Sequence, residues 1–180
     1  MSKHTVLFTE RRIQERVREL GVQISADYDG KEIVLVGLLK GACVFLVDLG
    51  RVIETIGRVD ACRMEFLGVE SYGEGRIPGD IRIDLDVRRS LRHQHVIVVD
   101  DVADTLRTFK TVVRHIKEKR PKSVRTCVLI EKPDKHKVRV KLDYVGFSRP
   151  NLGFIYGYGM DLEGRFRFLP FIATAPSSAS

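Results

Sequence analysis

The sequence predicts an α/β fold, in which a single domain holds a mostly parallel, twisted sheet flanked by helices. Two short, nearly continuous apolar runs, Ile33–Leu39 and Val96–Val99, are typical of strands that are buried on both faces. Amphipathic segments with apolar residues at helical spacing follow both runs. Strands that alternate with helices favour a parallel sheet with helices on both faces. The length of 180 residues fits one domain of this kind.

The first helix is predicted to begin after Thr9, a residue type favoured at helix N-caps, and to end at Gly21. Its apolar face would contain Ile13, Val17 and Leu20. After the strand Ile33–Leu39, a second amphipathic helix is predicted to follow Lys40-Gly41 and to end at Gly57. The beginning of the chain therefore has the helix–strand–helix order of an α/β domain.

The same alternation continues along the rest of the chain. Apolar and charged residues alternate in Asp60–Leu67, which predicts a strand. The strand Val96–Val99 precedes a helix with a basic last turn, which Pro121 closes. Further strands are predicted at Val124–Ile130, Asp143–Phe147 and Phe154–Tyr156. Because ligands of such sheets bind beyond the carboxyl ends of the strands, the residues that follow strands are the candidate site residues.

Composition excludes several classes of protein. The hydrophobic fraction of 43% is too high for a disordered chain, and no apolar run approaches the roughly 18 residues that cross a bilayer. The charged stretch Glu10–Glu19 is unlike a secretory signal. Cys43, Cys62 and Cys127 lie in apolar runs without metal-ligand spacing, so we expect buried, reduced thiols in a cytoplasmic protein. The domain is expected to span residues 1–172, with a flexible polar tail at 173–180.

The chain carries 31 Lys and Arg residues against 24 Asp and Glu residues, a formal charge of +7. A basic protein can bind nucleic acid, and it can also bind small polyanions such as phosphorylated metabolites. Much of the basic charge lies in Arg82–His95, Arg114–Arg125 and Lys132–Lys141, where acids are interspersed. Such stretches are more often solvated faces than binding surfaces. Charge alone therefore does not choose between these interpretations.

The segment from Val96 to Thr108 carries the most chemical information. A buried strand is followed by Asp100, Asp101 and Asp104, and then by hydroxyl residues at the start of a helix. The free N–H groups of a helix N-terminus favour a phosphate, while carboxylates accept hydrogen bonds from ribose hydroxyls or bind Mg²⁺. This strand end would suit a phosphorylated sugar, but the same residue types also form ordinary helix caps and turns. The segment alone does not separate the two hypotheses.

Six further segments occur in a recognisable order: Leu38–Ala42, Ser71–Gly73, Glu131–Pro133, Asp143–Phe147, Gly157–Asp161 and Arg167–Pro170. Together with residues 96–108, they resemble the hypoxanthine-guanine branch of the type I phosphoribosyltransferases, from about Thr9 to Ile172. The resemblance implies the type I fold, with a small hood formed by the terminal segments. It also implies a Mg²⁺-dependent enzyme of purine salvage. The expected reaction transfers the 5-phosphoribosyl group of 5-phosphoribosyl 1-diphosphate to N9 of hypoxanthine or guanine, giving IMP or GMP and diphosphate.

The resemblance implies that several segments bind the sugar and its phosphates. Lys40, Gly41 and Arg167 are expected at the diphosphate, with a cis Lys40–Gly41 peptide bond that presents a backbone N–H. The expected ligands of the ribose and its 5-phosphate are Asp100, Asp101, Asp104, Thr105, Leu106, Arg107 and Thr108. These residues would hold the donor substrate at the carboxyl ends of the strands.

The resemblance places the purine near the C-terminal segments. Lys132 is expected to donate to the 6-oxo group of the base, which excludes adenine because its 6-amino group is also a donor. Phe154 is expected to stack on the base, and the backbone carbonyl of Ile155 to contact its exocyclic edge. Asp161 belongs to the same end of the site. A lysine that follows one strand would thus select the base.

Mg²⁺ is the expected cofactor, with Asp100, Asp101 and Asp161 as its ligands or as ligands of its water shell. Asp104 is the expected catalytic residue, because it would exchange a proton with N7 of the purine. Bond breaking would pass through a transition state with oxocarbenium character, which needs positioning and charge stabilisation by the protein. The stretch Ser71–Asp80 is the candidate for a mobile loop that excludes water.

Four features depart from the family's usual pattern. Asp100 stands where Glu is usual, Leu106 where a small residue is usual, and Gly153 where a longer side chain is usual. The loop after Tyr72 lacks a hydroxyl pair that the family often has. Leu resists the positive φ that glycine adopts freely, so phosphate binding is the function most affected. Because the other expected site residues are retained, an active enzyme is predicted.

Two alternatives remain open from the sequence. One is a regulator with this fold that binds RNA, and the other is a paralogue that binds nucleotide without efficient turnover. A pure RNA-binding regulator has no need of Lys132 and the purine end, so nucleic acid is not expected as a partner. The sequence does not specify a preference among hypoxanthine, guanine and xanthine. The resemblance implies a homodimer or homotetramer.

Overall fold

The computed structural model describes residues 4–71 and 81–175. Its central sheet has six strands in the order β4-β3-β2-β5-β6-β7. In that order they are Ile81–Leu85, Ala61–Ser71, Glu32–Leu39, His95–Ala103, Ser123–Glu131 and Tyr144–Ser148. All neighbouring strands pair parallel except β3 and β4. The predicted α/β fold with a mostly parallel sheet is therefore confirmed.

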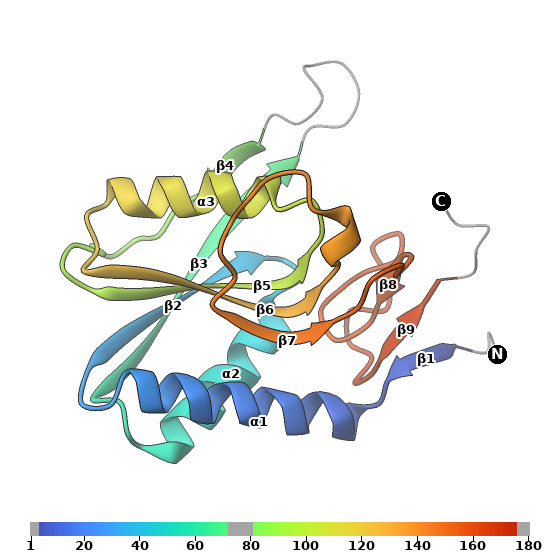
Figure 1. Ribbon diagram of the computed structural model, residues 1–180, viewed down its shortest axis with the longest axis horizontal. Coiled ribbons are helices and arrows are strands. Elements are labelled where there is room, and N and C mark those ends of the chain that lie inside the picture. The colour runs from blue at the N-terminus through green and yellow to red at the C-terminus, as the bar shows by residue number, and fades with distance from the viewer. Residues whose placement is uncertain (1–3, 72–80, 176–180) are drawn as a thin grey trace.

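The helices lie on both faces of this sheet (Figure 1). Helices α1 (Glu10–Asp27) and α2 (Cys43–Ile56) cover one face, and α3 (Arg107–Glu118) covers the other. Successive side chains of β2 alternate between two hydrophobic cores. Ile33 and Leu35 pack beneath α1 and α2, whereas Val34 and Val36 pack beneath α3. The continuous apolar run of β2 therefore reflects a strand with both faces buried.

Helix α1 corrects one prediction about where the first helix ends. Thr9 caps it as expected, since its hydroxyl accepts from the N–H of Arg12, but the helix continues past Gly21 to Asp27. Gly21 lies against α2, where an added Cβ would come within 2.4 Å of Cγ1 of Val52. This glycine therefore permits close helix packing and does not end the helix. Gly57, in contrast, ends α2 as predicted, in a left-handed conformation with φ of 68°.

Several strands extend beyond the predicted apolar runs. β5 continues through Ala103, so Asp100 and Asp101 lie within the strand and not after it. β3 continues to Ser71, and β4 was not predicted. Pairing with a neighbouring strand causes these extensions, because β5 stays in register with β6 past the end of its apolar run. Backbone hydrogen bonds to β6 thus keep the polar residues after Val99 in the strand.

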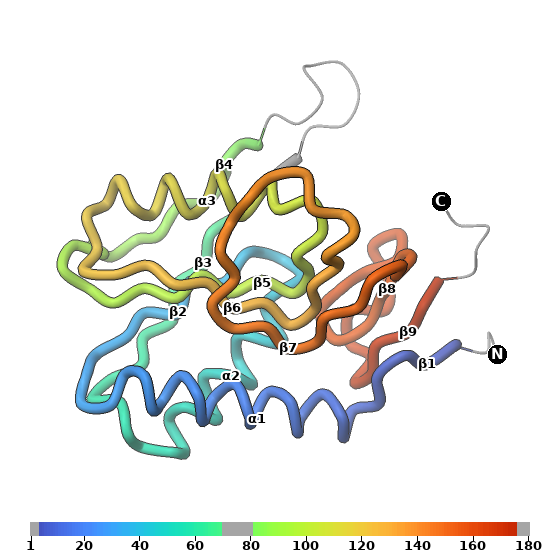
Figure 2. Tube along the Cα trace, in the orientation of Figure 1, coloured from blue at the N-terminus to red at the C-terminus, as the bar shows by residue number. Residues whose placement is uncertain are grey.

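A second, antiparallel sheet lies beyond the carboxyl ends of the central strands (Figures 1 and 2). It has the order β1-β9-β8, with β1 at Thr5–Phe8, β9 at Ile172–Thr174 and β8 at Ile155–Tyr156. We call this sheet, together with Phe154 before β8 and the loop 157–171, the hood. The chain termini thus pair in one small sheet, and the hood implied by the resemblance is present.

The first residues of the predicted flexible tail belong to a strand. Ala173 and Thr174 pair in β9, and Ala173 is fully buried, so the ordered part of the domain extends past residue 172. Residues 176–180 and most of the predicted mobile loop, Tyr72–Asp80, lie outside the described residues. The loop prediction therefore stays a prediction. No helix among the described residues is long and apolar enough to span a membrane.

The three cysteines are free thiols. Cys127 is buried as expected, whereas Cys43 and Cys62 are only half-buried. Burial nevertheless raises the pKa of Cys62 to about 12. The expected burial is therefore confirmed for Cys127 and was overestimated for Cys43 and Cys62.

Candidate active site

A cavity of about 390 Å³ lies between the carboxyl ends of the central strands and the hood. Its lining residues come from the β2–α2 loop, the ends of β5 and β6, and the hood. They include Lys40, Gly41, Asp101, Asp104, Lys132, Phe154, Ile155, Asp161 and Arg167, all of which are candidate site residues from the sequence. The fold thus brings residues that are far apart in the chain to one place.

Asp100 and Asp101 are neighbours in β5 and accept hydrogen bonds from the local backbone. Asp100 Oδ1 accepts from the N–H of Asp101 at 3.0 Å, and Asp101 Oδ1 accepts from the N–H of Val102 at 2.9 Å. Burial raises the pKa of both carboxyls, and the charge of Asp101 raises that of Asp100 further. A cation or a ligand with hydroxyl donors would relieve this unfavourable burial of charge.

Lys132 lies at the end of β6 with only 6% of its surface exposed. Its Nζ donates to the carbonyl oxygen of Gly153 at 2.8 Å and lies 3.5 Å from Oδ2 of Asp104. Its backbone N–H donates to the carbonyl oxygen of Ala103 at 2.9 Å, which ties it to β5. Because an ammonium has three donors, these partners leave donor capacity for a ligand in the cavity.

The hood presents an exposed aromatic ring to the cavity. Phe154 lines the cavity and is 52% exposed. The backbone around it is fixed, since its carbonyl oxygen accepts from the N–H of Ala175 at 2.9 Å, and Ile155 pairs with Thr174. An exposed phenyl ring on a fixed backbone provides a surface on which a flat ligand can stack.

Two glycines allow the β2–α2 loop to approach β5 and the hood. A Cβ on Gly41 would lie 2.0 Å from Oδ2 of Asp101, and a Cβ on Gly159 would lie 2.1 Å from the carbonyl oxygen of Gly41. Arg167 closes this corner of the site. It donates to the carbonyl oxygen of Gly159 at 2.8 Å and forms an ion pair with Asp161 at 2.6 Å. The loop that carries Lys40 is thus packed directly against an acid of β5.

Tyr158 anchors the hood to the helices. Its buried hydroxyl donates to Oδ2 of Asp48 at 2.7 Å, and the same oxygen accepts from Gln14 at 2.9 Å. Burial raises the pKa of Tyr158, so the hydroxyl stays protonated and can donate. This link joins α1, α2 and the turn that carries Asp161, and it was not predicted from the sequence.

The turn that opens α3 is shaped by Leu106. This residue has a φ of 62°, and its side chain is buried in the core beneath α3. Leucine therefore adopts the left-handed conformation that it was expected to resist, because burial of its side chain compensates for the unfavourable backbone. The carbonyl oxygen of Thr105 accepts from the N–H of Lys137 at 3.1 Å, which holds the turn in place.

Comparison with known proteins shows to which family this chain belongs. The family described as "Phosphoribosyl transferase domain" matches residues 6–163, nearly the whole described domain. The chain belongs to the phosphoribosyl transferase family. The resemblance that the sequence motifs indicated is thereby confirmed.

Curated relatives of this phosphoribosyl transferase carry a consistent name. The hypoxanthine-guanine phosphoribosyltransferase of Dictyostelium discoideum is 41% identical over 169 residues, which cover 93% of this chain and 92% of the relative. That of Mycobacterium tuberculosis is 38% identical over 177 residues, covering 94% and 85%. A bifunctional protein TilS/HprT of Listeria monocytogenes is 39% identical over 168 residues, covering 93% of this chain. The chain spans only about a quarter of the length of such bifunctional relatives, 25% for this one.

Solved structures of relatives share the fold. A hypoxanthine-guanine phosphoribosyltransferase from Bacillus anthracis superposes with a TM-score of 0.87 at 35% identity, covering 98% of this chain and 100% of that one. A hypoxanthine phosphoribosyl transferase from Trypanosoma cruzi superposes with a TM-score of 0.90 at 34% identity, covering 99% and 95%. The type I phosphoribosyltransferase fold predicted from the sequence is therefore confirmed.

Some predicted residues of this phosphoribosyl transferase do not line the cavity. Asp100, which lies within β5, and Thr105–Thr108, which lead into the first turn of α3, are absent from its lining, although they flank Asp104 along the chain. The cis peptide bond is Leu39–Lys40, so its expected position at Lys40–Gly41 was wrong by one residue.

Two lining residues were missed, Val102 and Met160. Both lie inside segments that suggested the family, but an apolar side chain at a strand end or turn is ordinarily part of a core.

The acids of the site fit a bound Mg²⁺ through their chemistry. No group of three His, Cys, Asp or Glu side chains converges anywhere in the described residues. Mg²⁺ is usually held by one or two carboxylates together with waters and substrate phosphates, so such a group is not required. Asp100 and Asp101 supply hard oxygen ligands whose charges the fold leaves poorly compensated. Asp161 is already held by Arg167 and by the N–H of Gly164 at 2.8 Å.

Proposed function

We propose that this phosphoribosyl transferase uses 5-phosphoribosyl 1-diphosphate and a 6-oxopurine, hypoxanthine or guanine, to form IMP or GMP and diphosphate. The observation that carries this proposal is the position of Lys132, whose amine lies 3.5 Å from Asp104 at the end of a neighbouring strand. A donor for the base and an acceptor for its proton are thus side by side in one cavity.

Base selection follows from the donors at the purine end. The ammonium of Lys132 can donate but cannot accept, so it suits a 6-oxo group and disfavours the 6-amino group of adenine. Buried polar groups discriminate strongly because a mismatched ligand leaves them without a partner. The exposed ring of Phe154 would hold the purine plane against this donor.

The proposed reaction forms one bond and breaks one bond at C1 of the ribose. N9 of the purine bonds to C1, and the bond from C1 to the diphosphate oxygen breaks. The proton that the purine carries at N7 passes to the carboxylate of Asp104, whose side chain is 46% exposed and lines the cavity. The electron pair of the broken bond leaves with the diphosphate.

The leaving diphosphate needs positive charge, and the site supplies cations from two directions. Lys40 follows β2, while Arg167 comes from the hood and is fixed by Asp161. Mg²⁺ held by Asp100, Asp101 and Asp161 would add charge stabilisation of the leaving oxygens. Residues Thr105–Thr108 would bind the 5-phosphate at the start of α3. This arrangement positions both substrates without a covalent enzyme intermediate.

The proposal includes a cytoplasmic enzyme of purine salvage that assembles as a homodimer or homotetramer. Its ordinary partners would be small molecules, and its catalytic domain would extend over residues 1–172 with the β9 residues that follow. The names of the relatives support the role in purine salvage, and the other points rest on the sequence analysis and on the strand pairing of β9.

The test is a diphosphate-release assay with 5-phosphoribosyl 1-diphosphate and each purine base, with and without Mg²⁺. We expect release with hypoxanthine or guanine in the presence of Mg²⁺ and none above background with adenine. Stoichiometric nucleotide binding without diphosphate release would contradict the proposal and favour a nucleotide-binding paralogue. Salt-dependent RNA binding without base turnover would favour a regulator.

A further inference from the structure

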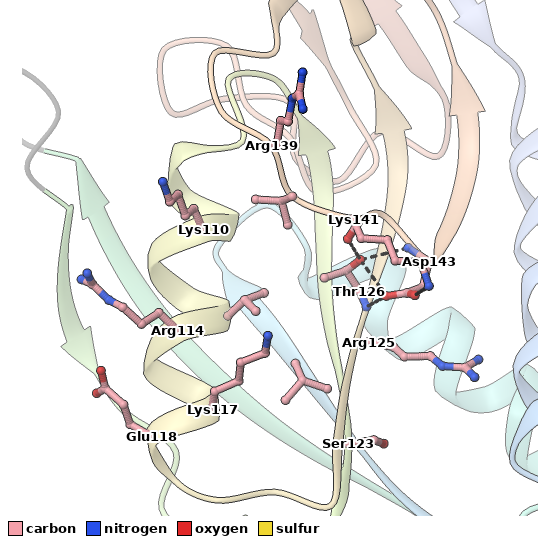
Figure 3. A pocket seen from close by; sticks show the side chains of 13 residues that line it. Lys110, Arg114, Lys117, Glu118, Ser123, Arg125, Thr126, Arg139, Lys141 and Asp143 are labelled. Atoms are coloured by element: carbon pink, nitrogen blue, oxygen red, sulfur yellow. Dashed lines mark hydrogen bonds and ion pairs between the residues drawn. The ribbon is translucent and has the colours of Figure 1, made fainter.

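A second and larger cavity, of about 870 Å³, lies between α3, β6 and residues 139–143 (Figure 3). It shares no lining residue with the active-site cavity. Cationic side chains dominate the charged part of its lining. We call this cavity the basic groove, and its cations are Lys110, Arg114, Lys117, Arg125, Arg139 and Lys141.

Most of this positive charge is not neutralised. The lining contains two acids, Glu118 and Asp143. Asp143 forms an ion pair with Lys141 at 2.7 Å, and Arg125 forms an ion pair with Asp27 at 2.5 Å. The other four cations are exposed, and their side chains form no hydrogen bond or ion pair with any described residue. In a chain with a formal charge of +7, they are free to attract an anionic partner.

The local structure explains why these cations lie together. Lys110, Arg114 and Lys117 follow one another at spacings of four and three residues, which places them on one face of α3. The opposite face of α3 buries Phe109, Val112 and Ile116. Figure 3 shows the side chain of Lys117 extending from α3 toward β6. The second wall alternates, since Val138, Val140 and Leu142 pack against the core while Arg139 and Lys141 are exposed.

Part of the groove lining is apolar, beside the polar Ser123 and Thr126. Val113, Val124 and Val140 line it and are only partly buried. Among the residues that the structure describes, no aromatic side chain lines the groove. Single-stranded nucleic acids are usually bound by stacking on aromatic side chains, and a free polyphosphate would gain nothing from three valines. A ligand that suits both the cations and the valines of the groove is a polypeptide segment with acidic and apolar side chains.

We propose that the basic groove is a docking site for an acidic peptide segment of a partner protein. Its Asp and Glu side chains would meet Lys110, Arg114, Lys117 and Arg139, and its apolar side chains would cover the valines. An amphipathic helix in a groove is a common way to bind such a segment. The groove volume of about 870 Å³ is within the range of ordinary ligand-binding pockets. The proposal does not depend on the reaction catalysed at the other cavity.

The test uses fluorescence anisotropy with a labelled synthetic peptide of glutamates and leucines, in which the leucines recur at helical spacing. A peptide with the same number of glutamates but alanine for leucine is the matched probe. We expect the leucine peptide to bind wild-type protein at least about 5-fold more tightly than the alanine peptide, because only it covers the valines. The affinities of both peptides should fall with added salt.

Charge reversal at one position tests the location. Lys117→Glu should weaken binding of the leucine peptide about 10-fold. Arg18→Glu is the matched control, because Arg18 is an exposed cation of α1 without a partner among the described side chains; it should change the affinity less than about 2-fold. Val113→Thr, which preserves side-chain shape, should weaken the leucine peptide and leave the alanine peptide unchanged. Thermal unfolding checks that each variant is folded.

Three results would overturn the proposal. Equal loss of binding in Lys117→Glu and Arg18→Glu would show that only net charge matters. Tighter, Lys117-dependent binding of a labelled oligouridine than of the leucine peptide would assign the groove to nucleic acid. Failure of the leucine peptide to bind at low salt would show that the groove does not dock acidic segments.

Discussion

The two ends of the central sheet treat carboxylates in opposite ways. At the amino end, Arg125 donates to Asp27 and to the hydroxyl of Tyr144 at 2.5 Å each, and that hydroxyl donates to Asp27 at 2.7 Å. The hydrogen bond from Tyr144 lowers the pKa of Asp27. At the carboxyl end, burial raises the pKa of Asp100 and Asp101. Hydrogen bonds and an ion pair thus stabilise the charged carboxylate at the amino end, whereas burial disfavours the charged carboxylates at the carboxyl end, where the candidate site lies.

The largest expected effect is a loss of turnover when an acid at the carboxyl end of the sheet is replaced and the amino end is left unchanged. Asp104→Ala should lower kcat by about 10²–10³-fold, because the acceptor for the purine proton is lost. The affinity for 5-phosphoribosyl 1-diphosphate should change much less, since other residues hold the sugar and phosphates. Steady-state kinetics and a direct binding titration measure the two quantities. Asp134→Ala, at an exposed acid in the short 3₁₀ helix Pro133–Lys135, is the control and should change neither. Equal losses of turnover and binding in Asp104→Ala would refute proton transfer by this residue.

The next effect concerns base selection. Lys132→Gln should lower kcat/KM for hypoxanthine by about 10²-fold, because a buried charged donor is replaced by a shorter neutral one. Its amide can also accept, so discrimination against adenine should narrow. Competition kinetics with hypoxanthine and adenine measure both changes. Lys135→Gln, at an exposed lysine three residues away, should behave as wild type. Unchanged discrimination in Lys132→Gln would remove the lysine from base recognition.

Replacing one Asp by Asn at each end of the sheet tests whether the two ends differ in stability in the way described. Asp27→Asn should destabilise the fold by about 1 kcal/mol, because it weakens a partly exposed ion pair and a hydrogen bond from a buried tyrosine. Asp100→Asn should instead stabilise the Mg²⁺-free protein, because it removes a buried charge and keeps an oxygen that can accept from the N–H of Asp101. Calorimetry at neutral pH should show Tm shifts of about 2–4 °C with opposite signs. Tm shifts of the same sign in the two variants would show that Asp27 and Asp100 do not have opposite effects on stability.

The effect of Asp27 should also depend on pH in a defined direction. Because the folded-state pKa of Asp27 lies below its ordinary value of 3.8, its contribution to stability is present above that pH. The contribution is lost as pH falls through the lowered folded-state value. The Tm difference between wild type and Asp27→Asn should therefore persist from neutral pH to about pH 5 and shrink below pH 3.8. A difference that grows on acidification would have the wrong sign.

The smallest expected effect concerns the link between the hood and the helices. Tyr158→Phe removes the hydrogen bond to Asp48 and should raise KM for 5-phosphoribosyl 1-diphosphate about 3- to 5-fold, consistent with about 1 kcal/mol for one hydrogen bond. The change in kcat should be smaller, because Tyr158 positions the turn of Asp161 and touches no reacting atom. Tyr156→Phe is the control, since that hydroxyl bonds to His4 within the N-terminal segment and not to a helix. Equal kinetic effects of the two variants would exclude a positioning role for Tyr158.

Local patterns in the sequence were sufficient for the main elements of the fold. Helical spacing and apolar runs located α2, α3 and the buried strands because those elements are amphipathic or wholly apolar. The predicted strand Phe154–Tyr156 is present as β8, but β1 and β9 were not predicted, because they are short and form by pairing between the two ends of the chain. Gly21 was misinterpreted because a glycine that ends a helix and one that admits a neighbouring helix look the same until the neighbour, Val52, is known.

The sequence also predicted part of the candidate site, namely most of the residues that line its cavity but not the contacts that hold them in place. The acids that follow the β5 apolar run indicated sugar-phosphate chemistry, and the residue order along the chain indicated the purine end. The bond from Tyr158 to Asp48 spans 110 residues, so no local pattern could reveal it. The basic groove depends on which cations lack partners, and that is a property of the folded surface.

We propose that one cavity joins the end of β5, which binds the pentose, to Lys132, which selects a ring carbonyl. The most direct test is a product analysis in which the purified protein receives 5-phosphoribosyl 1-diphosphate, Mg²⁺ and equal amounts of hypoxanthine and adenine. We expect IMP to accumulate together with an equal amount of diphosphate and no AMP to form. Formation of AMP at a comparable rate, or the absence of any nucleotide product, would contradict it.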